Sequence, residues 1–314
     1  MLNNKDALIL YELDMNSRLS AAQVAKKSKL RKETVAFRMR KLGCVKKYYA
    51  LCDSTLLGYT NYKLYIRFQN ADSQTIKKFQ AAAMRIPHVS WFAYCSGRFD
   101  AAIAMWARNT TEFNDMVFEF LSKFSKFVSS KEMVANARWY VCNRKYLINN
   151  YKINVVSFGE NAKAVSLDAL DAKIIEVLNE DARARILDIA SAAGSSSPVV
   201  IQRIRRMQES GYLKLFTLEL DLDKMNMEFG KILVTLQNAT LETATDLLNH
   251  CKRHPHIRSI IHTIGPWDME LELEVKNFRH LFEIISDIRT KFPIVKSAEV
   301  LMFTRQYAKN FVGA

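Results

Sequence analysis

The segment SSSPVVIQRIRRM (195–207) has a counterpart near the start of the chain, LRKETVAFRMRKL (30–42). A shift of 165 residues places Val35 on Val200 and aligns the basic and apolar positions on either side. In both segments the apolar residues recur at spacings of four and three, which predicts a helix with one buried face. The chain therefore carries two copies of one basic amphipathic helix.

The repeat continues on both sides of this helix. Asp6 matches Asp171 at the same shift, and Gly97 matches Gly265 at a shift of 168, because the second copy has three extra residues after the helix. Each copy begins with three short amphipathic helices, the last two joined by a tight turn. This pattern is typical of a helix-turn-helix.

The remainder of each copy alternates between strands and helices. NYKLYIRFQ (61–69) and KILVTLQ (231–237) open a series in the order β-α-β-β-α-β, which is typical of a ferredoxin-like domain. The predicted fold class is therefore α+β, a tandem repeat of an N-terminal (winged) helix-turn-helix and a ferredoxin-like βαββαβ domain. Ser197 as N-cap and Pro198 at the first helical position are expected to start the third helix of the second copy.

The positive charge of the chain lies in its first half. The net charge is +14, and residues 1–160 hold 26 Lys and Arg against 12 Asp and Glu, whereas residues 161–314 hold 20 of each. A basic surface of this kind favours a polyanion as partner.

Other features of the composition exclude several classes of protein. No apolar run is long enough to cross a membrane, and the N-terminus lacks the pattern of a signal peptide. The five cysteines are odd in number and scattered, which favours reduced thiols in a cytoplasmic protein over disulfides or a zinc site. We found no nucleophile-base pair, phosphate loop or metal cluster, so we expect no enzyme, no cofactor and no metal.

Three motifs of the second copy carry a resemblance to a known family: LDALDAKIIEVLNEDAR, SPVVIQRIRRMQESGYLK and IGPWDMELEL. The first copy has weaker versions: LNNKDALILYELDMNSR, KETVAFRMRKLGCVKKY and SGRFDAAIAMW. In this order they resemble the Lrp/AsnC family of prokaryotic transcriptional regulators, and the resemblance covers essentially the whole chain, twice. It implies double-stranded DNA as partner, and an effector domain that binds an amino acid or related small molecule.

The resemblance also implies the domain organisation. The expected segments are a helix-turn-helix domain at 1–52 (head 1), effector domain 1 at 53–145, a linker at 146–165, a second helix-turn-helix domain at 166–220 (head 2) and effector domain 2 at 221–314. Members of the family carry one of each domain per chain and pair through the effector domains. Here the two copies could pair within one chain as a pseudo-dimer, or two chains could pair as a homo-oligomer, and the linker permits either.

The third helix of each head is the candidate recognition helix, because its outward side chains can reach base edges and phosphates. The predicted DNA-binding residues are Lys32, Glu33, Thr34, Phe37, Arg40 and Lys41 in head 1, and Ser197, Val199, Gln202, Arg205 and Arg206 in head 2. Gln202 is suited to adenine and Arg206 to guanine. The predicted phosphate contacts are Lys26, Lys27, Lys29 and Arg31.

Two arginines have alternative roles. Arg38 and Arg203 flank the buried face of their helices, and each copy keeps an aspartate in its first helix, Asp6 or Asp171. An ion pair within the head and a DNA contact are both open for them.

The two heads are unequal. Residues 1–50 hold 12 Lys and Arg against 4 Asp and Glu, whereas residues 166–216 hold seven of each, and the first recognition helix is about one turn shorter. We expect head 1 to supply electrostatic affinity and head 2 to read more of the sequence, so the operator should be asymmetric.

The resemblance places effector binding at a Gly-x-x-Asp turn in each copy, Gly97 to Asp100 and Gly265 to Asp268. Glycine permits close approach of a ligand and the carboxylate can accept from an ammonium group. The alternative is a plain β-turn, in which both residue types are common.

Two rival functions follow from the same architecture. Some relatives decarboxylate sirohaem using His and Arg near these strands, and the chain has His88, His254, His256 and His262 in that neighbourhood. Pro-His is more simply a corner between a helix and a strand. The second rival is a sensing or co-assembly protein whose heads do not bind DNA, which the neutral head 2 favours and the basic head 1 opposes.

Overall fold

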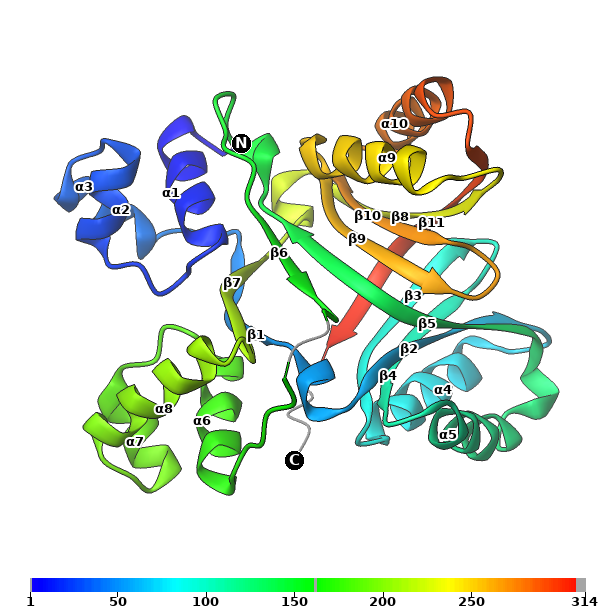
Figure 1. The fold of residues 1–314 in the computed structure, drawn as a ribbon, viewed down its shortest axis with the longest axis horizontal. Helices are drawn as coiled ribbons and strands as arrows, with labels where there is room; N and C mark the ends of the chain where they lie inside the picture. The colour runs from blue at the N-terminus through cyan, green and yellow to red at the C-terminus, as the bar shows by residue number, and fades with distance from the viewer. Residues whose placement is uncertain (1, 161–162, 309–314) are drawn as a thin grey trace.

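The computed structural model describes residues 2–160 and 163–308. The two heads lie on one side of the molecule and the sheets of the effector domains on the other (Figure 1). Strands β1 and β7 connect the two sides. The tandem α+β architecture is confirmed.

Each head consists of three helices around a small apolar core. They are α1 (Asn4–Asp14), α2 (Ala21–Ser28) and α3 (Lys32–Met39) in head 1, and α6 (Ala169–Glu180), α7 (Ile186–Ala193) and α8 (Ser197–Glu209) in head 2. Val35 and Val200 are fully buried, as their spacing predicts. The turn before each third helix needs a left-handed residue, which is Gly194 (φ 67°) in head 2 and Lys29 (φ 58°) in head 1. A side chain is strained in this region, whereas glycine is not.

The start of α8 differs from the prediction. Ser196 is the N-cap, Ser197 is the first helical residue and Pro198 lies in the first turn, with no side-chain hydrogen bond at the cap. Pro198 fits because the first amide groups of a helix lack acceptors within the helix. The start of this helix is therefore set by proline, and the predicted serine cap is wrong.

A strand follows each head, and the two strands pair. β1 (Val45–Cys52) and β7 (Leu213–Leu220) are antiparallel, with Tyr49 opposite Thr217. Head 1 packs on Leu218 and Leu220 of β7, which belong to the second copy. Head 2 packs on Ala50 of β1 in the same way. Each head therefore completes its core with the strand of the other.

Both effector domains have the predicted element order. Domain 1 contains β2 (Thr60–Phe68), α4 (Ser73–Arg85), β3 (Val89–Gly97), β4 (Ala101–Ala107), α5 (Thr110–Ser122) and β5 (Val128–Cys142). Domain 2 contains β8 (Glu228–Leu236), α9 (Leu241–Arg253), β9 (Ile257–Ile264), β10 (Met269–Val275), α10 (Phe278–Lys291) and β11 (Val295–Ala308). Short 3-10 helices lie at Ser54–Leu57, Ser125–Phe127, Lys145–Leu147 and Asp223–Met225.

The two effector sheets join edge to edge into a closed barrel. The strand order within the sheets is β5-β2-β4-β3 and β11-β8-β10-β9, and the sheets meet at β3–β11 and at β5–β9. Helices α4 and α5 cover one side of the barrel, and α9 and α10 the other (Figure 1). The copies therefore pair within one chain, which closes the sheet edges that a single copy would leave open.

The predicted linker carries a strand of its own. β6 (Val155–Phe158) is antiparallel to the end of β5, and the rings of Trp139 and Phe158 stack at 4.6 Å between centroids. The connection between the copies is therefore partly fixed to the barrel.

A buried charged cluster occupies the barrel interior. Glu270 Oε2 lies 2.8 Å from Lys231 Nζ and 2.5 Å from Lys63 Nζ, and Tyr65 donates to Glu270 Oε1 at 2.7 Å. Burial acts to raise the pKa of Glu270, but the two ammonium groups outweigh it and lower that pKa to about 2. The interior is therefore held by ion pairs as well as by apolar packing.

Candidate nucleic-acid interface

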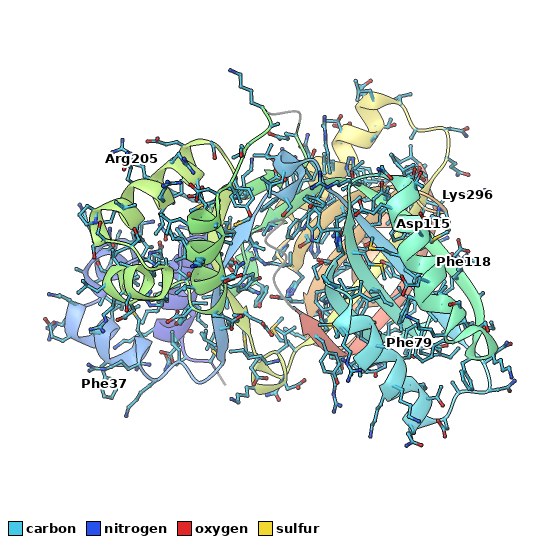
Figure 2. The ribbon with its side chains drawn as sticks, turned by 90° about the horizontal axis from the view of Figure 1, so that it is seen from below. Phe37, Phe79, Asp115, Phe118, Arg205 and Lys296 are labelled. Atoms are coloured by element: carbon cyan, nitrogen blue, oxygen red, sulfur yellow. The ribbon has the colours of Figure 1, made fainter. Side chains whose placement is uncertain are left out.

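The recognition helix of head 1 presents the predicted residues to solvent. Five of the six predicted contacts on or beside α3 are exposed and Thr34 is half-buried. Phe37 is 49% exposed and points away from the head at the outer end of the molecule (Figure 2), and Lys41 Nζ lies 4.4 Å from the centre of its ring. This side of α3 is open for a partner.

The recognition helix of head 2 is longer and presents a mixed surface. Gln202, Arg205 and Arg206 are exposed, and Ser197 and Val199 are half-buried. Arg205 points outward from the same side of the molecule that carries the α3 contacts (Figure 2). Its guanidinium pairs with Glu209 at 2.7 Å, one helical turn further on. Such an exposed pair is weak and can open for a phosphate.

The arginines with alternative roles form ion pairs within the heads. Arg38 Nη1 lies 2.9 Å from Asp6 Oδ1, and Arg203 Nη1 lies 3.3 Å from Asp171 Oδ1. Arg206 also pairs with Asp171, which has a fully buried side chain. The ion-pair alternative is therefore the one observed. Arg206, predicted to read guanine, is engaged by the same carboxylate.

The predicted phosphate contacts lie at the turn that leads into α3. Lys26, Lys27, Lys29 and Arg31 are all exposed. Lys27 lies 3.6 Å from Glu12, whereas the other three have no ion-pair partner among the described residues. Together with Lys32 at the first position of α3, they form an unneutralised cationic group. Head 2 has no corresponding group, because Gly194 and three serines occupy the equivalent turn.

Two arginines that the repeat aligned, but to which we assigned no role, hold the heads together. Arg18 donates to the carbonyl of Ala182 at 2.5 Å, and Arg183 donates to the carbonyls of Ser17 and Leu19. Each arginine thus spans from its own head to the other. Arg18 and Arg183 align at the shift of 165, and this alignment is the sequence signal that could have indicated their shared role.

A buried network, which sequence analysis missed, ties head 1 to effector domain 2. Arg144 lies between Asp14 of α1, at 2.5 Å, and Glu274 of β10, at 2.8 Å. Burial acts to lower the pKa of Arg144, but the two carboxylates outweigh it and raise that pKa well above its usual value. Arg258 of β9 lies 3.5 Å from Asp14. No sequence signal brought these distant residues together.

The Gly-x-x-Asp turns have a clear structural role. The Asp100 carboxylate accepts from the backbone amide of Phe68 at 2.7 Å, and Asp268 accepts from that of Leu236 at 2.7 Å. At Gly97 a Cβ atom would collide with the carbonyl of Val300. A Cβ at Gly265 would lie 2.7 Å from Val134 Cγ1. Both turns are therefore fitted to the strands of the other copy.

The histidines sit at corners and in the layers around the barrel. His88 Nδ1 lies 2.9 Å from the carbonyl of Trp106, and His256 Nδ1 lies 2.8 Å from that of Glu274. These equivalent bonds tie each helix-to-strand corner to the neighbouring strand. Burial and the charge of His256 lower the pKa of His254 to about 4. His88 and His256 therefore lie at corners between a helix and a strand, as the Pro-His pattern indicates.

No helix in the described part of the chain is long and apolar enough to cross a membrane.

Comparison with known proteins supports the assignment of head 2. The AsnC-type helix-turn-helix domain matches residues 167–208, which lie in head 2. The transcriptional regulator FL11 of Pyrococcus horikoshii is 24% identical over 146 residues, which is 46% of this chain and 95% of that protein. The regulator AzlB of Bacillus subtilis is 24% identical over 136 residues, 43% of this chain and 87% of that protein. Such relatives correspond to about one copy of the repeat.

One solved structure matches both copies at once. The sirohaem decarboxylase NirDL has a TM-score of 0.64 and 13% identity, covering 98% of this chain and 93% of that one. At this identity the likeness concerns the fold. The fold of both copies together is therefore similar to that of this structure.

The motifs in both copies, the match of head 2 and the regulators that align with one copy all agree. The helix-turn-helix of head 2 is of the AsnC type, and the chain resembles regulators of the Lrp/AsnC family, with the helix-turn-helix and the effector domain duplicated in tandem.

Proposed function

We propose that the chain is a sequence-specific transcriptional regulator that binds double-stranded DNA with both heads. The observation that carries this proposal is the exposure of both recognition helices on one side of the molecule, with cations beside α3 that have no ion-pair partner in the part of the chain that the structure describes. An exposed helix that follows a tight turn can enter the major groove, and the cations beside it can neutralise phosphates.

The heads contribute differently. Head 1 offers Lys26, Lys29, Arg31 and Lys32 as free cations, which bind DNA without regard to sequence. Head 2 offers Gln202 on the exposed side of a longer helix, and a Gln side chain can bond adenine through two hydrogen bonds. Arg206 contributes little to base reading while Asp171 holds it. Because the two half-sites face unlike helices, we expect an asymmetric operator.

Selection from a random DNA library tests this proposal. An enriched asymmetric site whose affinity falls steeply with salt supports it, whereas a palindromic site contradicts the unequal heads. On the selected site, Gln202→Ala should cost about 1–3 kcal/mol and relax one position. Lys32→Gln should weaken all sites about equally and reduce the salt slope by about 1. Lys296→Gln, on β11 and away from the heads in Figure 2, is the matched control.

We further propose that an amino acid or related small molecule binds beside the Gly97 and Gly265 turns and changes DNA affinity. Arg98 supports this for the first turn, because its guanidinium is partly exposed, 2.9 Å from Glu132 and 3.0 Å from Glu299. The second turn has Trp267 buried instead. Calorimetric titration with the amino acids tests this, and Arg98→Met should abolish any binding at the first turn.

A second candidate function is decarboxylation of a tetrapyrrole. The likeness in fold to NirDL over 98% of the chain favours it, and the engagement of His88 and His256 in corner bonds opposes it. Addition of sirohaem to the purified protein distinguishes the two functions. A shifted absorbance band with loss of carbon dioxide would support the enzyme, and an unchanged spectrum would oppose it.

A further inference from the structure

A cavity of about 320 Å³ lies at the mouth of the barrel that faces the heads. Its walls come from the barrel strands, and its roof from β1 and from Asn179 of α6. This volume is at the small end of the range for ligand sites, about 300–1,000 Å³. It suits a molecule of one or two rings.

The pseudo-symmetry of the chain shows why the cavity exists. Four residues of its wall occupy the positions of the buried network around Arg144 in the other half. The aligned pairs are Asn179 with Asp14, Trp106 with Glu274, Ser90 with Arg258, and Tyr49 with Thr217. In the other half Arg144 fills the corresponding space, where its guanidinium meets Asp14 and Glu274. Among the residues that the structure describes, there is therefore one open site and one closed equivalent.

Aromatic residues line the cavity, whereas ion pairs fill the equivalent space in the other half. Of the four tryptophans in the sequence, Trp91, Trp106 and Trp139 line it. Flat rings favour a flat aromatic partner through offset or edge-to-face packing. The charged groups of the wall are Lys63, Arg138, Asp53 and Glu272, and their formal charges cancel. An uncharged ligand therefore fits this wall better than an ion does.

Three polar atoms of the wall lack partners. Trp139 Nε1, Asn136 Oδ1 and Asn179 Oδ1 are buried and have no hydrogen-bond partner among the described residues. Asn179 is only 4% exposed. An unpaired buried polar group costs about 1–3 kcal/mol, so a ligand that pairs with such groups after small side-chain rotations gains affinity. One donor and two acceptors require a ligand with both an acceptor and a donor, as an amide has.

We propose that this cavity binds a small planar heteroaromatic molecule without net charge that carries an amide-like edge. The ligand lies between the tryptophan rings, and its edge pairs with the amide side chains of the wall. Because the roof includes β1 and α6, the ligand contacts the strand after head 1 and the first helix of head 2. This site lies near the heads and is separate from the Gly97 and Gly265 turns, and it does not depend on DNA binding.

Nicotinamide and nicotinate are a matched pair of probes, since they share a ring and differ in charge. Titration of the full chain by calorimetry should show nicotinamide or adenine binding and nicotinate binding at least tenfold more weakly. Trp139→Ala should reduce the affinity at least tenfold. Ala104→Leu, which adds volume to the cavity wall, should do the same without a change in melting temperature. Phe118→Ala, which removes an exposed aromatic residue of α5 outside the cavity, is the control and should bind as the parent does.

The last six residues of the sequence follow Ala308, which also lines the cavity. A chain that ends at Ala308 therefore completes the experiment. Binding of the neutral probes to the shortened chain but not to the full chain would overturn the proposal. Binding to neither chain, equal binding of nicotinate, or unchanged binding in both cavity variants would also overturn it.

Discussion

Arg144 offers the sharpest test of how the heads are fixed to the barrel. Its guanidinium lies 2.5 Å from Asp14 and 2.8 Å from Glu274, and the side chains of all three are at most 7% exposed. Arg144→Met keeps most of the aliphatic volume but leaves the buried Glu274 without its cation and Asp14 with only Arg258, 3.5 Å away. Loss of one partner from a buried ion pair costs about 3–5 kcal/mol. Because single domains are stable by only about 5–15 kcal/mol, this loss should be large.

Urea unfolding followed by circular dichroism measures this loss. The matched control is Arg98→Met, because Arg98 also pairs with two glutamates but is 39% exposed. Exposed pairs contribute about 0–1 kcal/mol. The double variant Arg144→Met/Glu274→Gln should be more stable than Arg144→Met alone, because one unpaired charge is removed. An Arg144→Met cost no larger than that of Arg98→Met would refute the reasoning.

Three further predictions follow from other features. Lys29→Gly should raise the free energy of unfolding by up to about 1 kcal/mol, because glycine adopts the left-handed conformation of Lys29 without strain, while the salt slope of DNA binding falls by about 1. Arg18→Met should cost about 1–3 kcal/mol by leaving the carbonyls of Ala182 and Ala184 without this donor, and an unchanged urea midpoint would count against the clasp between the heads. His254 has a pKa of about 4 in the folded chain against 6.5 as its ordinary value, so the unfolded chain takes up the proton first and stability falls between pH 6.5 and pH 4. Over this range His254→Gln should lose about 3 kcal/mol less than the parent, and equal losses would contradict the assignment.

The local architecture could be predicted from the sequence because it depends on periodicity. The buried positions Val35 and Val200, the helix-turn-helix and the βαββαβ order all follow from spacings within one copy. The ion pairs of Arg38 and Arg203 could be anticipated because the repeat preserved both partners. The start of α8 was misplaced by one residue, since Ser196 and Ser197 are equivalent as caps in sequence terms.

The contacts between the copies could not be predicted. Arg144, Asp14 and Glu274 are far apart in sequence, and nothing in their local pattern marks them as partners. The choice between pairing within one chain and between chains depends on which sheet edges meet, and a flexible linker permits both. Among the described residues no side chain fills the cavity as Arg144 fills the equivalent space in the other half, and this difference depends on how the two copies pack.

The closed barrel also determines what the protein can exchange with its surroundings. At both junctions, β3 with β11 and β5 with β9, the edges of the effector sheets are already paired within one chain. A half-length relative would therefore find no open sheet edge at these junctions. Dilution cannot separate the two heads either, because both belong to one chain and their association does not depend on protein concentration. The two copies are consequently free to accumulate different substitutions, while each remains matched to one permanent partner.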